Sequence, residues 1–147
     1  MDVKIRKGAK EDIPSAYNLV RELAIYERAL EIMSNTPEKM ARDLDNKLFE
    51  FIVAELDGKI VGMSLYYFRY STWKGKRLYM EDIIVTESHR GNGIGKLLFE
   101  GTVAIAKESE CTGMRWQVLD WNTSAVNFYR KYGTSFDDEW INCNLDF

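Results

Sequence analysis

Residues 85–96 form a glycine-rich segment at the point where the hydrophobic pattern of the chain changes its period. Before it, Arg77–Val85 is an apolar-rich run that predicts a strand. After it, from Ile94 onward, apolar side chains recur at three- and four-residue spacing and predict an amphipathic helix. Glycines let backbone N–H groups approach a ligand together, and a helix N-terminus attracts anions. The segment therefore predicts a strand–loop–helix unit with an anion site, and its glycines are Gly91, Gly93 and Gly95.

Two cationic side chains, Arg90 and Lys96, flank these glycines and favour a phosphate ligand. Other phosphate-binding loops fit less well. A Walker A loop needs Lys followed by Ser or Thr, whereas Lys96 is followed by Leu97. A dinucleotide fingerprint needs the spacing G-x-G-x-x-G, whereas the chain has G-x-G-x-G. The remaining structural alternative is a tight strand-to-helix turn that binds nothing.

The other segments predict a mixed α/β sheet. Two β-rich runs, 50–56 and 59–70, are joined by Asp57-Gly58, which is typical of a tight hairpin, and 77–85 adds a third strand. A strand–helix–strand unit from residue 77 onward indicates a right-handed crossover between parallel strands. Helices are expected over about 10–29, 37–44, 94–106 and 123–132, and further strands over 3–6, 113–119 and 139–145.

Composition limits the class of protein. With 147 residues the chain suits one domain, 1–147, and 20 Lys plus Arg against 23 Asp plus Glu give a net charge of −3. This mild acidity argues against a nucleic-acid-binding protein. No apolar run is long enough for a signal peptide or a membrane span, so we expect a cytoplasmic protein. The few cysteines and histidines, Cys111, Cys143 and His89, exclude a zinc finger and predict no metal site.

With Arg90 included, the loop reads R-G-N-G-I-G and resembles the R/Q-x-x-G-x-G/A signature of the GNAT superfamily of N-acetyltransferases. Residues 78–85 resemble that family's core strand. Residues 121–129 resemble its late motif, in which a helix carries N-x-x-A/S-x-x-F/Y. The resemblance covers nearly the whole chain. It implies a GNAT-like fold: a mixed, mostly antiparallel sheet with helices on both faces and a splayed parallel strand pair.

A narrower resemblance links the chain to the diamine acetyltransferases, the group that holds the spermidine/spermine and thialysine enzymes. It rests on five short pieces in one order: 22–27, 66–68, 73–75, 79–82 and 127–129. The tight hairpin at 57–58 departs from the longer insertion of the eukaryotic members. The resemblance implies acetyl-CoA as co-substrate, a small cationic amine as acceptor and a homodimer, with no nucleic-acid or membrane partner.

Acetyl transfer to an amine requires a neutral nucleophile and a proton for the departing thiolate. An alkylamine with a pKa near ~10.4 is only about 0.1% neutral at pH 7.4. By resemblance, Glu81 faces the acceptor and takes its proton through water, or alternatively holds the cation. Tyr129 is expected to protonate the thiolate, since a phenol remains protonated at neutral pH. The structural alternative for Glu81 is an exposed strand carboxylate. For Tyr129 it is a core aromatic on an amphipathic helix, which is the favoured interpretation without the resemblance.

The resemblance also assigns binding residues. The pantetheine arm is expected along the core strand, with main-chain bonds at Ile83 and Val85. The diphosphate is expected on the loop, and the late motif adds weaker candidates for the cofactor. The loop residues are Arg90, Gly91, Asn92, Gly93, Ile94, Gly95 and Lys96. The late-motif residues are Asn122, Ser124 and Lys131. The substrate-binding candidates are Tyr26, Glu27, Trp73, Glu81 and Asp82, which combine carboxylates with aromatic rings suited to ammonium groups.

Three other functions remain open at this stage. The same fold could serve a protein, amino-acid or antibiotic amine. A non-catalytic acyl-CoA-binding domain is disfavoured by the joint presence of Glu81 and Tyr129. A nucleotide-binding module is disfavoured by the spacing of the loop glycines.

Overall fold

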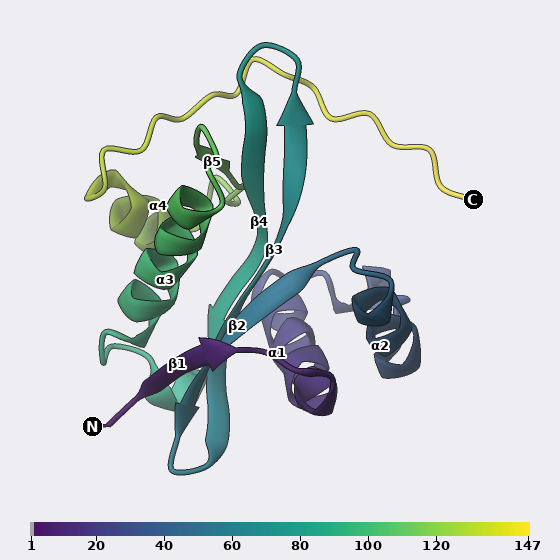
Figure 1. Cartoon of the computed structure of the whole chain (residues 1–147), viewed down its shortest axis with the longest axis vertical. Coiled ribbons are helices and arrows are strands. Elements are labelled where there is room, and N and C mark those ends of the chain that lie inside the picture. Colours follow the sequence, from purple (N-terminus) through teal and green to yellow (C-terminus); the bar gives the residue numbers. More distant parts are fainter. Residues whose placement is uncertain (1) are drawn as a thin grey trace. The chain divides into compact units, whose positions relative to one another are not determined.

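The computed structural model describes residues 2–147. Along these residues the chain forms strands, α-helices and short 3-10 turns in an order that agrees with the mixed α/β prediction (Figure 1). The strands are β1 (Lys4–Lys7), β2 (Glu50–Leu56), β3 (Lys59–Ser71), β4 (Gly75–Val85) and β5 (Met114–Arg115). The α-helices are α1 (Ile13–Tyr26), α2 (Pro37–Asp45), α3 (Ile94–Glu108) and α4 (Thr123–Arg130). The 3-10 turns are η1 (Lys10–Asp12), η2 (Leu30–Ile32) and η3 (Glu87–His89).

The strands make one sheet in the order β1-β2-β3-β4-β5. Neighbours from β1 to β4 are antiparallel, and β4 pairs with β5 in parallel. This parallel ladder holds only two pairs, Leu78 with Met114 and Tyr79 with Arg115, although β4 continues to Val85. The predicted fold, a mostly antiparallel sheet with a parallel pair that separates, is therefore confirmed.

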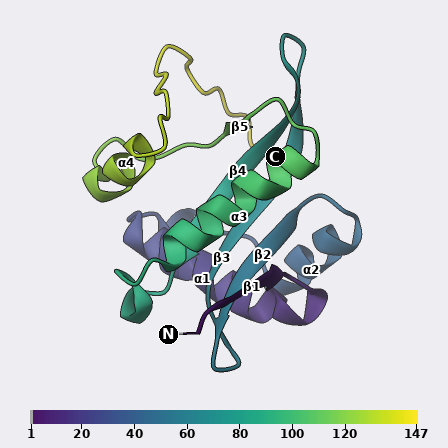
Figure 2. The same ribbon diagram turned by 60° about the vertical axis from the view of Figure 1, so that its left-hand side comes forward.

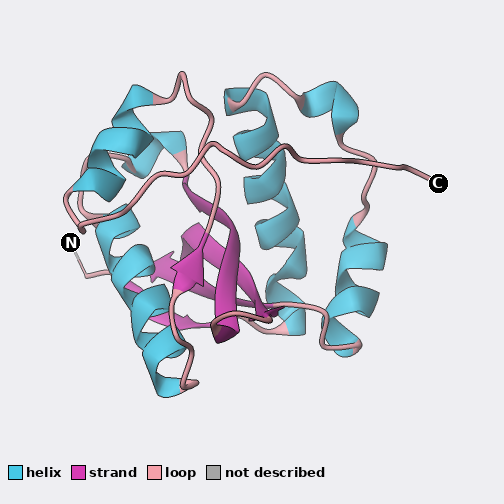
Figure 3. Cartoon of the chain, turned by 90° about the horizontal axis from the view of Figure 1, so that it is seen from above, coloured by secondary structure: helices cyan, strands magenta, loops and turns pink. Residues whose placement is uncertain are grey.

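Strand alternation sends side chains to two different helical layers. Phe51, Val53, Met63 and Leu65 share one core cluster with the buried face of α1. The intervening residues face α3, whose buried Thr102 donates a hydrogen bond of 2.7 Å to the Ser64 hydroxyl. Figure 3 shows α1 and α2 on one side of the sheet, and Figure 2 shows α3 crossing the other side. Helices on both faces were expected from the sequence.

Element boundaries follow from local chemistry. The Thr36 side chain accepts a hydrogen bond from the Lys39 N–H and begins α2, with Pro37 in the first turn. Asp57 and Gly58 both have positive φ, as a two-residue hairpin between β2 and β3 requires. Helix α1 ends at Tyr26, before the predicted residue 29, because Arg28 turns to φ 60°.

Two sequence-based strand predictions need correction. Residues 139–145 were expected to be the last strand, but the structure has no strand there, and Trp140, Ile141 and Leu145 are exposed. Alternation alone does not make a strand, because its N–H and C=O groups need a neighbouring strand. The strand expected over 113–119 is reduced to β5, since pairing with β4 stops at Tyr79.

The chain divides into two compact units, one ending at Trp116 and the other spanning Gln117–Phe147. The first holds the whole sheet with α1, α2 and α3, and the second holds α4 and the C-terminal segment. The single domain 1–147 stays a prediction.

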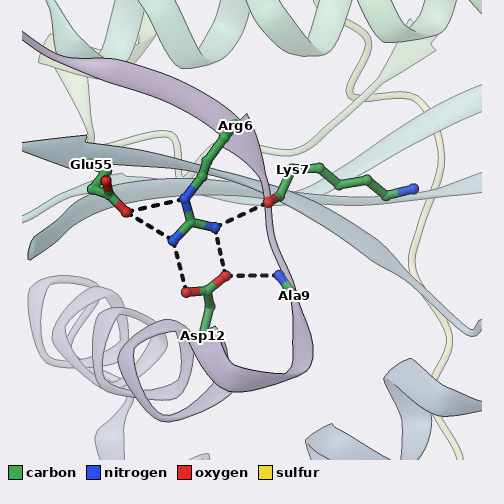
Figure 4. Close-up of polar contacts among 5 residues, drawn as sticks. All are labelled: Arg6, Lys7, Ala9, Asp12 and Glu55. Carbon is green, nitrogen blue, oxygen red and sulfur yellow. Dashed lines mark hydrogen bonds and ion pairs between the residues drawn. The ribbon is translucent and has the colours of Figure 1, made fainter. Parts of the chain in front are cut away.

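An ionic cluster joins β1, β2 and the start of α1 (Figure 4). The Arg6 guanidinium binds both Asp12 carboxylate oxygens, at 2.8 and 2.9 Å, and Glu55 Oε1 at 3.0 and 3.1 Å. Asp12 also accepts the Ala9 N–H at 2.8 Å. The hydrogen bonds from Arg6 hold the pKa of Asp12 below its ordinary value. The cluster thus anchors the entry to α1, the helix that later contributes to the site.

We expect Asp12→Ala to lower the free energy of unfolding by about 1–3 kcal/mol at pH 7, because Arg6 loses a bidentate partner. Urea unfolding measures this. Asp12 has a folded pKa below its unfolded one, so its stabilisation is present above an unfolded pKa near ~3.9 and disappears as the pH falls through the folded pKa. Asp45→Ala, which breaks the exposed pair with Lys10, is the control and should change stability by less than about 0.5 kcal/mol. Equal losses at both positions would contradict the assignment.

Candidate active site

A β-bulge in β4 places two carboxylates side by side. Leu65 pairs with Asp82 and Tyr66 pairs with Met80, so Glu81 is an extra residue opposite the β3 ladder. A bulge of this kind interrupts alternation, and neighbouring side chains can then face the same side of the sheet. Glu81 and Asp82 accordingly line one cavity on the α1 side of the sheet.

That cavity has a volume of about 360 Å³ and combines apolar walls with acidic groups. Val20 of α1, Met40 of α2 and Leu65 of β3 supply apolar surface, with Phe49 beside them. Glu81 and Asp82 come from β4, and α2 adds Asp43. No lysine or arginine lines the cavity among the described residues. A ligand with an ammonium group on a short carbon chain suits such a lining.

Burial and neighbouring negative charge raise the pKa of one carboxyl of this cavity, Asp82. Burial raises the pKa of Asp82 to about 7, and the charges of Glu81 and Glu27 add to the effect. Burial also raises the pKa of Glu27. Neighbouring carboxylates disfavour each other's ionised form, and a cation between them favours it. Glu27, the residue that caps α1, therefore acts on the cavity electrostatically, although it does not line it.

Glu81 has a direct partner from the neighbouring strand. The Tyr67 hydroxyl donates a hydrogen bond of 3.1 Å to Glu81 Oε1. The Tyr67 ring packs on Tyr79, with ring centroids 5.4 Å apart, across the β3–β4 ladder. Neither Tyr67 nor Asp43 was selected from the sequence as a site residue. Tyr67 lies in the 66–68 piece of the family resemblance but was given no role, and Asp43 lies in none of the five pieces.

The glycine loop has the geometry of an anion site. Gly93 has φ 79° and directly precedes α3, and Gly91 has φ 81°. By position, the N–H groups of Ile94, Gly95 and Lys96 have no partner within their own helix. A side chain at Gly91 or Gly93 would meet no atom within 4 Å, so glycine is needed there for conformation rather than for space. These residues fit a diphosphate group.

Helix α1 is tied to this loop through Glu22. Its carboxylate accepts hydrogen bonds from the Thr86 hydroxyl at 3.0 and 3.1 Å and from the Glu87 N–H at 2.8 Å. Arg90 Nη2 lies 3.9 Å from the same carboxylate, and its guanidinium stacks over Tyr26 at 5.1 Å. Glu22 is half-buried and lies in the 22–27 piece of the resemblance, but it was not selected as a site residue because its partners Thr86 and Glu87 are more than sixty residues away in the sequence. The structure thus brings predicted residues Arg90 and Tyr26 together at the loop.

The predicted cofactor strand has one edge without a strand neighbour. Between Met80 and Val85, β4 pairs with β3 on one side, and no described strand pairs with it on the other. The Val85 carbonyl accepts a bond of 2.9 Å from Arg90 Nε, which holds the loop against the end of β4. Ile83 is half-buried on this strand. An extended ligand arm can add to such an edge through main-chain bonds.

The remaining candidates lie elsewhere. Trp73, near the tip of the β3–β4 hairpin, is 88% exposed and does not line the cavity. In the unit 117–147, the Asn122 side chain caps α4 by accepting the Ala125 N–H at 3.3 Å. Tyr129 is a buried residue of that helix, and its ring meets Phe128 edge to face. Ser124 is in the exposed first turn, and Lys131 follows the last residue of the helix. Their cofactor and catalytic roles stay predictions.

The described residues show neither a membrane-spanning helix nor a cluster of metal ligands. None of their helices has the length and apolar character needed to cross a bilayer. Within the same residues, no group of three or more His, Cys, Asp or Glu side chains is arranged to hold a metal ion.

Comparison with known proteins gives a consistent result. Residues 14–134 match the family model described as Acetyltransferase (GNAT) family. The chain is 36% identical over 141 residues to thialysine N-epsilon-acetyltransferase of Bos taurus, covering 89% of this chain and 83% of that protein. It is 36% identical over 149 residues to spermidine/spermine N(1)-acetyltransferase-like protein 1 of Homo sapiens, covering 93% of this chain but only 21% of that longer protein.

A solved structure, of an aminoglycoside acetyltransferase from an uncultured soil metagenomic sample, superposes with a TM-score of 0.81. It is 23% identical, and the match covers 99% of this chain and 96% of the other. At that identity the likeness concerns the fold alone.

Proposed function

The chain belongs to the GNAT family of N-acetyltransferases, and on that premise we propose that it moves an acetyl group from acetyl-CoA directly to the primary amine of a small cationic acceptor. A diamine, a polyamine or a thialysine-like or lysine-like amino acid is the acceptor class. The observation that carries this choice is the cavity lined by Asp43, Glu81 and Asp82, to which no cationic side chain of the described residues 2–147 contributes. Relatives named for thialysine and for spermidine/spermine support the same class.

The residues divide into two groups in this proposal. The loop from Arg90 to Lys96 binds the diphosphate of acetyl-CoA through main-chain N–H groups and positive charge. The edge of β4 near Ile83 and Val85 orients the extended arm. Asn122, Ser124 and Lys131 are further contacts to test. Acetyl-CoA, when bound, supplies the activated acetyl group.

Glu81 and the acidic cavity act on the acceptor. The neutral fraction of an alkylamine, about 0.1% at pH 7.4, corresponds to a barrier contribution of roughly 4 kcal/mol. Glu81 removes the ammonium proton, directly or through water, after Asp82 and Glu27 have attracted the cation. Tyr129 then donates its phenolic proton to the departing thiolate. Positioning and proton transfer together are sufficient for such a reaction.

A panel of acceptors tests the proposal. Thioester cleavage is measured with diamines, polyamines, thialysine, lysine, an aminoglycoside, streptothricin and a peptide amine. We expect kcat/KM to be highest for the small diamines, polyamines or thialysine-like amines. Highest activity on the peptide or on an antibiotic would show that the proposed acceptor class, a small cationic amine, is wrong. Tight acetyl-CoA binding without turnover on any amine would point to a non-catalytic acyl-CoA-binding protein.

A homodimer and a single domain over 1–147 belong to the same proposal. The homodimer is what the resemblance to the diamine group implies, and the single domain is what the length of 147 residues predicts. Size-exclusion chromatography with light scattering tests the dimer, and elution at the 17.1 kDa of one chain would contradict it.

We expect Asp82→Asn to weaken binding of the acceptor amine and to raise the stability of the fold at pH 8. The folded pKa of about 7 exceeds an unfolded value near ~3.9, so the folded state loses stability as the pH rises between these values. The variant removes this penalty, and its Tm at pH 8 should rise. It also removes a charge from the cavity, so KM for the acceptor should rise about tenfold with KM for acetyl-CoA unchanged.

Asp57→Asn in the exposed hairpin is the matched control and should leave both quantities unchanged. A lower Tm for Asp82→Asn at pH 8, or an unaltered KM for the acceptor, would remove Asp82 from the acceptor site.

A further inference from the structure

Tyr67 lies directly beside the bulge of β4. It pairs with Tyr79 in the β3–β4 register, two residues before Glu81, and its hydroxyl reaches Glu81 Oε1 at 3.1 Å. The bulge makes this possible, because the extra residue turns toward the face that Tyr67 occupies. The bond therefore joins two strands at the one position where their regular pairing is interrupted.

The Tyr67 side chain is itself held in place. Its ring is half-buried and packs on Tyr79 with centroids 5.4 Å apart. The Arg69 guanidinium lies 4.7 Å from the centroid of the Tyr79 ring. A phenol that belongs to β3 and packs on a ring of β4 offers a donor in a defined position.

Glu81 needs such a donor because it is otherwise an exposed glutamate with three rotatable side-chain bonds. A bond to Oε1 restricts these rotations and leaves the second oxygen for water or the acceptor. The donor also remains protonated. Burial and the charge of Glu81 raise the pKa of Tyr67 to about 12, so its O–H is intact throughout the neutral range.

We propose that Tyr67 is a positioning residue for acetyl transfer, which orients the Glu81 carboxylate toward the acceptor amine through its hydroxyl hydrogen bond. The inference rests on the proposed role of Glu81 as the proton acceptor. Tyr67 itself transfers no proton in this scheme. Its effect passes entirely through Glu81, which makes the proposal testable by coupling the two residues.

The experiment compares wild type, Tyr67→Phe, Glu81→Gln and the double variant, with the best acceptor of the panel and with acetyl-CoA. Tyr67→Phe keeps the ring and its packing and removes only the hydroxyl. Tyr79→Phe is the matched control, since Tyr79 lies opposite in the ladder and no hydrogen bond joins it to Glu81. Thermal unfolding of each variant verifies that it is folded.

We expect Tyr67→Phe to lower kcat about tenfold, the loss that one hydrogen bond to a charged group can produce. KM for acetyl-CoA should stay within about twofold, and so should all constants of Tyr79→Phe. In the Glu81→Gln background, Tyr67→Phe should have almost no further effect, because there is no longer a base to orient.

Each other outcome contradicts the proposal. Wild-type kinetics for Tyr67→Phe, with Glu81→Gln impaired, would overturn the positioning role and leave the proposed function standing. Equal losses from Tyr67→Phe in both backgrounds would show a structural contribution that does not act through Glu81. Wild-type rates for Glu81→Gln would remove the base, and the inference would fall with it.

Discussion

Replacing Tyr129 by phenylalanine is expected to lower kcat by about 10²-fold or more, because the departing thiolate loses its proton donor. Tyr129 is a buried residue of α4, and Phe keeps the ring, which meets Phe128 edge to face with centroids 5.4 Å apart. The change therefore removes a hydroxyl and little packing. Steady-state kinetics with saturating acetyl-CoA and acceptor give the rate.

Binding separates the chemical role from a structural one. Calorimetric titration with acetyl-CoA should give the same Kd for wild type and Tyr129→Phe, since the proposed diphosphate site is the loop before α3. Tyr132→Phe, near the same helix, is the control and should keep its kcat within about twofold. An unchanged kcat for Tyr129→Phe would take Tyr129 out of the mechanism.

The second large effect is expected at Glu81. Glu81→Gln should lower kcat/KM at pH 7.4 by about 10²-fold, since the ammonium proton loses the acceptor proposed for it. The amide is isosteric and can still accept the Tyr67 hydrogen bond, so the fold around the bulge should persist. Rates over a range of pH measure the effect.

The pH dependence distinguishes two roles for Glu81. If it removes the proton, the rate of Glu81→Gln should increase about tenfold per pH unit toward the acceptor pKa near ~10.4, because bulk water then supplies the neutral amine. If Glu81 only holds the cation, KM for the acceptor rises instead and kcat changes little. A variant with neither change would show that the carboxylate at the bulge is dispensable.

Much of the fold follows from short-range patterns. The hairpin at Asp57-Gly58, the strand over 50–56 and the helix that begins at Ile94 agree with the structure. Each depends on the backbone preferences and hydrophobic period of consecutive residues. The last strand, predicted over 139–145, is wrong for the opposite reason: a strand needs a partner that consecutive residues do not specify.

The site was predicted less completely than the fold. Arg90 and the loop glycines are consecutive or nearly so in the sequence, so the sequence alone predicted that they lie together. Glu22 and Tyr67 reach the site from other elements. Both lie in pieces of the family resemblance, 22–27 and 66–68, but nothing in their local sequence shows that they contact the loop or Glu81. Trp73 shows the reverse, a residue chosen by resemblance that does not line the cavity.

By itself, the sequence determined the strand–loop–helix unit with its glycines, the family and the candidate acid and base, because each is encoded in a contiguous pattern. Only the tertiary structure decided that Glu81 is a bulge residue, that Asp43 of α2 joins Asp82 in one cavity, and that Tyr67 holds Glu81. The physical reason is strand register. A shift of one residue in the pairing of β3 with β4 reverses which side chains share a face, and that shift exists only once the strands are paired.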